Sequence, residues 1–503
     1  MKKIISILFL LLVLNNVKAN NLVMSTPTYN DATKTISFTI AWNNSWKIST
    51  GPSNYDGVWV FIKRQACSST NIWATALIST TSGDHTTSVT SGSSLLSVDA
   101  VSDGMGVFIR RTASGTGSIS THTINLKLNS SLTTQPAITA SVADNFKVYG
   151  VEMVYVPQGG FYLGDGRPTN TSNFSSGDNA STALFIDAAK QTAGLGAATV
   201  YTSNPVYGCP NNLPSTFPLG YNGYWCMKYE IGMVAYVDFL NSLSYDQQAI
   251  RLTKWGTRYP NIVGTYFTNM GNKGDLHIVT AGTYNTIPAV FGTSSLTNYS
   301  PVNYLSWNDL TAYLDWTGLR PMTEFEYEKS CRGTQNPVAL EYPWGNTLIT
   351  SASGTNLYGQ IDEKPGQLGE GLCLYNWDDY NWSPYRSGYA ATSTSTRSQS
   401  GATYYGIMDM GGNLFEQVVG GGSGYDYSGF TTANGDGVLG ADGNANTVGW
   451  PTYSGSNSGN FTKGGSFGTG ATVVQVSDRS YYGGNGYNSG QDAHSGGRGV
   501  RSF

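Results

Sequence analysis

The stretch Gly406–Val419, GIMDMGGNLFEQVV, places two carboxylates, Asp409 and Glu416, on either side of a Gly-Gly-Asn turn. Only 12% of the 503 residues are charged, so a carboxylate pair around a glycine turn calls for an explanation. Such a pair can serve as a general acid and base, as ligands of a metal ion, or as solvated surface. The rest of the sequence has to decide among these three interpretations.

The first 19 residues predict a secretory signal peptide. Lys2 and Lys3 precede a short apolar run, Ile4–Leu14, and the small residue Ala19 closes the segment. The run is too short to span a membrane, and this order of charge, apolar core and small residue is typical of a cleaved signal. We therefore expect a mature chain that is secreted, periplasmic or at the cell surface, without a membrane span.

The composition excludes some partners and favours others. A formal net charge of −4 gives no support to nucleic-acid binding or to a basic membrane-binding face. The chain has 62 Gly and 33 Tyr, a composition more typical of sheets and loops than of a helical bundle. Few charges and many aromatic, hydroxyl and amide groups suit a surface that binds through stacking and hydrogen bonds.

Cysteine and histidine usage predicts disulfides rather than a histidine metal site. The five cysteines allow up to two disulfides in an oxidising compartment; they are Cys67, Cys209, Cys226, Cys331 and Cys373. We expect Cys209 to pair with Cys226, because the two flank one short loop. The four histidines are scattered without the spacing of metal ligands.

The N-terminal part, residues 20–147, is predicted to be an all-β sandwich domain. In KTISFTIAW, apolar Ile36, Phe38, Ile40 and Trp42 alternate with small or polar residues, as in a half-buried strand. GVWVFIKR, GVFIRR and HTINLKL repeat this pattern between turn-forming residues. We find no catalytic constellation in this part.

Helical periodicity appears in residues 148–503, which predicts an α+β chain whose second domain begins at residue 148. SWNDLTAYLDWTGL predicts a helix with Ser306 as its N-cap. TEFEYEKSCRG has Thr323 and Glu326 at capping-box spacing, and Gly333 can end that helix. GMVAYVDFLNSLS is a third helix candidate.

Seven stretches in fixed order carry a family resemblance. They are MVYVPQGGFYLGD, YWCMKYEIGMVAYVDFLN, PVNYLSWNDLTAYLDWTGLRPMTEFEYEKSCRG, YPWGN, YYGIMDMGGNLFEQV, KGGSF and GGRGVRSF. From about residue 150 to the C-terminus, the chain resembles the formylglycine-generating enzyme family, also called the sulfatase-modifying factor family. The resemblance implies a compact, irregular α/β variant of the C-type lectin fold.

The resemblance also implies that the opening stretch is a structural calcium site. Calcium takes six to eight oxygen ligands, and glycine lets backbone carbonyls turn inward. Matched position by position, the first site takes the carboxylates of Asp409 and Glu416 and the carbonyls of Gly412 and Leu414. A second, looser match takes Asn356, Asp378 and the carbonyls of Leu357 and Tyr380. The alternative is a hydrogen-bonded turn without a metal, and in either case the carboxylates are structural rather than an acid–base pair.

The catalytic cysteines of that family have no counterpart here. The family's enzymes hold copper with two cysteines that follow a Gly-Gly-Ser sequence, since thiolates bind copper(I) well. Alignment on Gly464, Gly465 and Ser466 places Thr469 and Val474 at the two cysteine positions. A hydroxyl and an isopropyl group cannot replace two thiolates, so we expect no copper. Ser466 matches a substrate-contacting serine and is a ligand-binding candidate.

The segment Ser480–Gly497, SYYGGNGYNSGQDAHSGG, is a candidate recognition surface. It is rich in Tyr, Asn, Ser and Gly, the residues favoured in adaptable binding loops. Its ligand-binding candidates are Tyr481, Tyr482, Asn485 and Tyr487. The resemblance implies that this segment crosses the face where the enzymes have their active site.

These observations predict a secreted pseudoenzyme that acts in binding, adhesion or envelope assembly, with a protein, a glycan or envelope-complex components as its partner. One alternative is a structural scaffold subunit of a motility or secretion complex. A second is a metal-dependent oxidoreductase of the same family. The iron-dependent C–S bond-forming members do not match, because their iron-binding histidines come from a helical domain and the β-rich part before residue 150 has only His85 and His122.

Overall fold

Strands predominate over helices in the described part of the chain, which agrees with the α+β class. The computed structural model describes residues 21–66, 73–129, 144–167, 173–176, 182–196, 200–201, 212–252, 276–294, 298–352, 363–367, 369–376, 383–420, 425–452, 459–481 and 491–503. The predicted signal peptide and Cys67 and Cys209 lie outside these residues. None of the described helices is long and apolar enough to cross a membrane.

The N-terminal part contributes strands to two sheets. The first sheet has the order β1-β3-β9-β6, with β2 paired to β3. Its strands are β1 (Val23–Met24), β2 (Thr28–Asn30), β3 (Thr35–Lys47), β6 (Thr86–Val89) and β9 (Gly115–Lys127). A short 3₁₀ helix, η1 (Ser82–Asp84), precedes β6.

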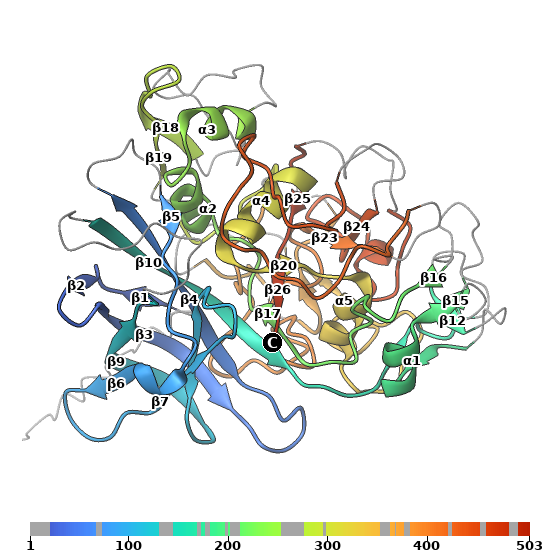
Figure 1. Cartoon of the computed structure of the whole chain (residues 1–503). Coiled ribbons are helices and arrows are strands. Elements are labelled where there is room, and N and C mark those ends of the chain that lie inside the picture. The colour runs from blue at the N-terminus through green and yellow to red at the C-terminus, as the bar shows by residue number, and fades with distance from the viewer. Residues whose placement is uncertain are drawn as a thin grey trace, which may run out of the picture.

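The second sheet joins the N-terminal strands to the rest of the molecule. Its order is β20-β26-β17-β10-β4-β8-β7, with β5 paired to β4. The strands are β4 (Asp56–Ala66), β5 (Ala74–Thr75), β7 (Leu96–Ala100), β8 (Val107–Arg111), β10 (Asp144–Val156), β17 (Tyr224–Met227), β20 (Arg320–Pro321) and β26 (Gly499–Ser502). Figure 1 shows β10 running from the blue N-terminal strands to the centre of the molecule, where β17, β26 and the C-terminus lie.

The domain boundary expected between residues 147 and 148 falls inside β10. This strand pairs with β4 from Asp144 to Val154, and its last residues, from Met153 to Val156, pair with β17. The two expected domains therefore share one hydrogen-bonded sheet. Sequence patterns could not show this, because each part of the strand alternates normally by itself.

Two apolar clusters cover the faces of this shared sheet. One contains Ile36, Phe38, Ile40 and Trp42 of β3 together with inward residues of β4, β7, β8 and β9, and the burial of these four residues confirms the predicted alternation. The other contains N-terminal residues such as Trp59 and Phe108 together with residues of the C-terminal part. Phe108 stacks on Trp225 of β17 with ring centroids 4.2 Å apart.

Two helices begin at the capping residues that the sequence predicts. The predicted N-cap Ser306 accepts a hydrogen bond from the backbone of Asp309 at the start of α4, and Thr323 and Glu326 form the predicted capping box. Gly333 is the C-cap of the helix that Thr323 begins. The described α-helices are α1 (Ala188–Ala193), α2 (Met233–Leu240), α3 (Tyr245–Arg251), α4 (Trp307–Thr317) and α5 (Glu324–Arg332).

Smaller sheets complete the C-terminal part. A three-stranded sheet has the order β24-β23-β25 and contains the opening stretch. Its strands are β23 (Phe415–Val419), β24 (Asn460–Lys463) and β25 (Ser495–Gly496). The two-stranded pairs are β11 (Phe161–Leu163) with β13 (Leu184–Ile186), β12 (Ser175–Ser176) with β15 (Val200–Tyr201), β14 (Leu195–Gly196) with β16 (Asn212–Leu213), β18 (Leu276–Thr280) with β19 (Val290–Thr293), and β21 (Thr350–Ser351) with β22 (Leu372–Cys373). A second 3₁₀ helix is η3 (Ala471–Val474).

The described cysteines are buried thiols. Cys226, Cys331 and Cys373 are all free. The prediction of a disulfide between Cys209 and Cys226 is therefore wrong, because Cys226 is a free thiol. Its side chain points into the core from β17 and is fully buried, so it is not at the flank of a surface loop.

We predict that Trp59→Ala destabilises the whole chain and not the N-terminal strands alone. Trp59 is fully buried in the shared cluster, and its indole Nε1 donates to the Thr317 carbonyl at 2.8 Å. Removing so large a buried side chain should lower the free energy of unfolding by about 3–5 kcal/mol, measured by denaturant titration. Val23→Ala, at a residue that is 52% exposed, is the control and should cost less than about 0.5 kcal/mol. Two separate transitions, with only one of them shifted, would contradict a shared core.

Candidate functional site

The Gly-Asn turn of the opening stretch has an unusual backbone that its residues permit. Asp409, Gly412 and Asn413 have φ angles of 55°, 75° and 62°. A Cβ at position 412 would lie 2.3 Å from the Cys373 sulfur, so glycine is required there. The Asn413 backbone N–H donates to the Leu374 carbonyl at 3.0 Å. The turn is therefore fixed directly before β23, which contains Glu416.

Glu230 holds this turn from the segment that follows β17. Its Oε2 accepts from the Asn413 side-chain amide at 2.7 Å, and its Oε1 accepts from the Leu414 backbone N–H at 2.9 Å. Only 3% of Glu230 is exposed. Sequence reasoning missed this residue. The available signal was a single acidic residue in the otherwise largely apolar stretch YWCMKYEIGM.

Arg498 lies between the turn and the central sheet. Its Nε donates to Glu416 Oε1 at 2.6 Å, and one terminal nitrogen donates to the Asp409 carbonyl oxygen at 3.1 Å. The other terminal nitrogen donates to the carbonyls of Met227 and Lys228, each at 3.3 Å. The side chain is fully buried. One guanidinium thus connects β23, the 409 turn and the end of β17.

The carboxyl groups around Arg498 are all held in a buried environment. Burial raises the pKa of Glu230, Asp409 and Glu416, and the charges of Asp409 and Glu416 raise the pKa of Glu230 further. The positive charge of Arg498 lowers the pKa of all three and so favours their ionised forms. One oxygen of Asp409 also accepts from the Gly388 backbone N–H at 2.6 Å.

This arrangement fits a guanidinium better than a calcium ion at the first expected calcium site. The structure brings Asp409 and Glu416 together, but Arg498 bonds one oxygen of Glu416 and the Asp409 carbonyl. A divalent cation beside these atoms would be repelled by the guanidinium charge. Glu416 Oε2 is the one oxygen of the pair that is buried without a hydrogen-bond partner among the described residues.

Two further observations bear on metal binding. Within the described part of the chain, no group of three or more His, Cys, Asp or Glu side chains could hold a metal ion. The second calcium set, Asn356, Leu357, Asp378 and Tyr380, lies outside the described residues. Calcium binding by that set stays a prediction.

The two residues at the cysteine positions do lie together. A Cβ at Gly465 would come 2.8 Å from Thr469 Oγ1 and 3.1 Å from Val474 Cγ2. Thr469 closes a tight turn, because its hydroxyl accepts from the Ser466 N–H at 2.8 Å and donates to the Ser466 carbonyl at 3.0 Å. Val474 packs in an apolar cluster with Trp344. Neither side chain offers a thiolate for copper.

Of the candidate ligand residues, two fall in the described part of the chain. Ser466 is fully buried and its Oγ lies 3.2 Å from His494 Nδ1, and the ligand role expected for it stays a prediction. Tyr481 is half-buried, and its ring centroid is 5.4 Å from that of Phe415. Tyr482, Asn485 and Tyr487 lie outside the described residues.

We predict that Arg498→Met strongly destabilises the chain. The substitution keeps an unbranched apolar side chain at this position but leaves Glu416 buried without its cation, which should cost about 3–5 kcal/mol in denaturant titration. Arg110→Met is the matched control. Arg110 forms an ion pair with Asp99 at a similar nitrogen–oxygen distance, 2.5 Å, but the Asp99 side chain is 40% exposed to solvent. That substitution should cost no more than about 1 kcal/mol. Equal effects of the two substitutions would contradict a special role for Arg498.

Comparison with known proteins gives short but clear sequence matches. The chain is 53% identical to the mouse formylglycine-generating enzyme over 49 residues, which are 10% of this chain and 12% of the mouse protein. It is 48% identical to the Thermomonospora curvata formylglycine-generating enzyme over 48 residues, 10% of this chain and 15% of that protein. A bovine protein described as inactive Cα-formylglycine-generating enzyme 2 is 43% identical over 58 residues, 12% of this chain and 18% of the relative. The matches thus span less than a fifth of each of these relatives.

Among solved structures, the Major Tropism Determinant U1 variant matches with a TM-score of 0.22 and 13% identity, covering 85% of each chain. So low a score carries no structural argument. The model of the sulfatase-modifying factor enzyme 1-like domain matches residues 140–502. This range begins just before β10 and ends within β26, so it includes the Gly-Asn turn, Glu230 and Arg498. The chain belongs to the sulfatase-modifying factor, or formylglycine-generating enzyme-like, family.

Proposed function

We propose that this chain is a secreted, non-catalytic member of the family that acts by binding. The observation that carries the proposal is the pair Thr469 and Val474 at the two cysteine positions. One side chain is hydrogen-bonded within a turn and the other is packed among apolar residues. Copper(I) requires soft ligands such as thiolates, and neither side chain supplies one. The two positions thus lack the donor atoms of the oxidase reaction.

Two further facts support a binding role. The family includes a bovine member whose description already says that it is inactive, so loss of catalysis has a precedent among relatives. The segment Ser480–Gly497 of this chain has the Tyr, Asn, Ser and Gly composition of an adaptable recognition loop. Its described ends lie beside β23, since the Tyr481 carbonyl accepts from Thr462 of β24 and β25 pairs with β23. The segment is therefore anchored at both ends on the three-stranded sheet.

The predicted signal peptide defines where this binding takes place. Residues 1–19 would direct the chain out of the cytoplasm. The partner would then be a protein or a glycan of the envelope or of the surroundings of the cell. Aromatic and amide side chains suit both classes of partner, because they combine stacking area with hydrogen-bond donors and acceptors.

We predict that the triple variant Tyr482→Ala, Asn485→Ala and Tyr487→Ala loses ligand capture but remains folded. Tyr481 is left intact because its ring packs on Phe415. The purified mature chain would be tested on a glycan array and on a panel of biotinylated envelope proteins, with thermal unfolding measured in parallel. Capture should fall at least about tenfold, since aromatic residues dominate binding energy at such surfaces.

The control is Leu348→Ala with Val448→Ala, at residues that are 56% and 90% exposed and lie outside this segment. These substitutions should leave capture unchanged. Equal capture by the triple variant would contradict the assignment of the binding face. Oxidation of a peptide cysteine by the purified chain with added copper would overturn the non-catalytic role itself.

A further inference from the structure

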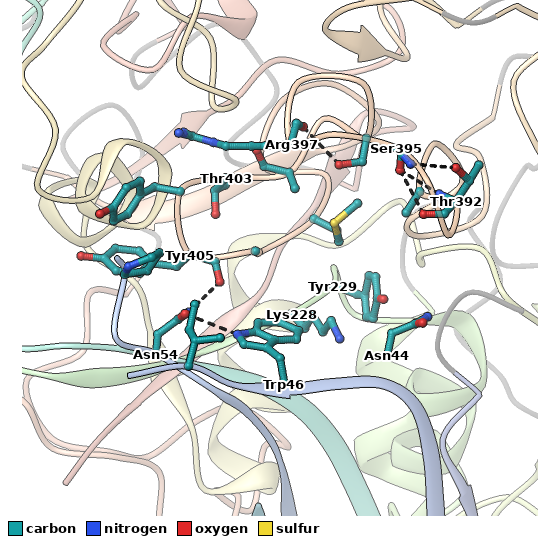
Figure 2. A pocket seen from close by; sticks show the side chains of 18 of the residues that line it. Asn44, Trp46, Asn54, Lys228, Tyr229, Thr392, Ser395, Arg397, Thr403 and Tyr405 are labelled. Atoms are coloured by element: carbon teal, nitrogen blue, oxygen red, sulfur yellow. Dashed lines mark hydrogen bonds between the residues drawn. The ribbon is translucent and has the colours of Figure 1, made fainter. Parts of the chain in front are cut away.

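A second candidate site lies where the N-terminal strands meet the C-terminal part. A cavity of about 490 Å³ opens between the β3–β4 hairpin, near Trp46 and Asn54, and a loop that includes Thr392 and Arg397. Lys228 and Tyr229, which follow β17, line it as well. Figure 2 shows these side chains facing one another across the opening. We call this space the hairpin cavity. Its volume falls within the range of about 300–1,000 Å³ common for small-ligand sites.

The walls of the hairpin cavity are held together by hydrogen bonds. The Asn54 amide donates to the Tyr405 carbonyl at 2.7 Å, and its oxygen accepts from the Trp46 indole at 3.3 Å. Asn54 thus joins the hairpin to the opposite loop (Figure 2). On the far wall, the Thr392 backbone N–H donates to Ser395 Oγ at 2.9 Å. A cavity with such connected walls needs little reorganisation to bind a ligand.

Lys228 is the group that points to a ligand. Only 4% of it is exposed, and its Nζ has no hydrogen-bond partner in the described structure. Asp56 and Glu152 lie 3.6 and 3.9 Å from Nζ, beyond hydrogen-bonding distance. Asp56 already accepts bonds from Ser45 and from the Trp46 backbone. Both carboxylates are therefore too distant to accept from the ammonium, and its donors stay unsatisfied, an arrangement that buried polar groups rarely keep.

The remaining lining combines an aromatic surface, hydroxyl groups and positive charge. Trp46 is only half-buried, unlike Trp42 and Trp59, and Lys228 Nζ lies 4.5 Å from its ring centroid. Thr392, Ser395 and Thr403 add hydroxyls, and none of the described residues that line the cavity carries a carboxylate. Arg397 adds a second cation, whose guanidinium donates to backbone carbonyls. These features favour a hydroxylated ring with an apolar face and a negatively charged group.

We propose that the hairpin cavity binds a sugar acid, a pyranose that carries one carboxylate. The carboxylate accepts hydrogen bonds from Lys228 Nζ, and the apolar face of the ring stacks on Trp46. The ring hydroxyls bond to the Thr and Ser side chains of the opposite loop. This site is separate from the Ser480–Gly497 face and does not depend on the function proposed for that face.

The test is calorimetric titration of the mature chain with glucuronate and galacturonate, and with glucose and galactose as neutral controls at equal ionic strength. The uronates should bind at least about tenfold more tightly than the neutral sugars, as expected for hydrogen bonds between charged groups. Lys228→Met should remove that preference. Circular dichroism and thermal unfolding would establish that this variant folds.

A blocking variant keeps the proposal testable if Lys228→Met does not fold. Ala391→Trp adds a large side chain to the cavity wall and removes none of the groups named above. It should abolish uronate binding, whereas Val448→Trp, at a residue 90% exposed and outside the cavity lining, should not. Absence of uronate binding to the wild-type chain, equal affinity for glucose and glucuronate, or full binding by Ala391→Trp would overturn the proposal.

Discussion

The buried contact between Arg498 and Glu416 is the constraint on which the centre of this molecule depends. Both side chains are at most 1% exposed, and their charged atoms approach to 2.5 Å. A buried carboxylate is costly unless a cation and hydrogen bonds compensate it, and the guanidinium supplies both. Because the same guanidinium also bonds to carbonyls of Met227, Lys228 and Asp409, it positions three chain segments relative to one another.

The contact between Arg498 and Glu416 connects the large shared sheet to the three-stranded sheet. β17 pairs with β10, and β10 pairs with β4 of the N-terminal part. Because Arg498 bonds to the end of β17, it is connected through this one sheet to the N-terminal strands. Glu416, the partner of Arg498, lies in β23, and β23 pairs with β24. The turn that contains Ser466 and Thr469 follows β24 in the chain. The two candidate binding regions are thus attached to one hydrogen-bonded centre. One is anchored beside β23, and the other is formed where the β3–β4 hairpin meets Lys228 at the end of β17.

Sequence patterns predicted the features whose causes are local. The capping residues Ser306 and Thr323 act within one helical turn, and the alternation of Ile36 to Trp42 reflects a single strand, so these could be read directly. The turn around Gly412 was also predicted, from its Gly-Gly-Asn sequence. What the sequence could not reveal depends on long-range contacts. Arg498 and Glu416 are 82 residues apart, and Glu230 and Asn413 are 183 apart. The resemblance implies a calcium ion beside the carboxylate pair, and the structure adds the contact of Arg498 with Glu416, which the sequence did not indicate.

The most direct measurement is a double-mutant cycle of Glu416→Gln and Arg498→Met, followed by denaturant titration in EDTA and again in calcium chloride. Within each condition, the cycle cancels the stabilisation that calcium bound elsewhere in the chain gives to all four proteins. If Arg498 is the cation of this turn, the coupling free energy should be at least about 2 kcal/mol and the same in both conditions. A Glu416→Gln substitution that costs stability only when calcium is present, with no coupling to Arg498 in EDTA, would contradict this conclusion and assign the turn to calcium.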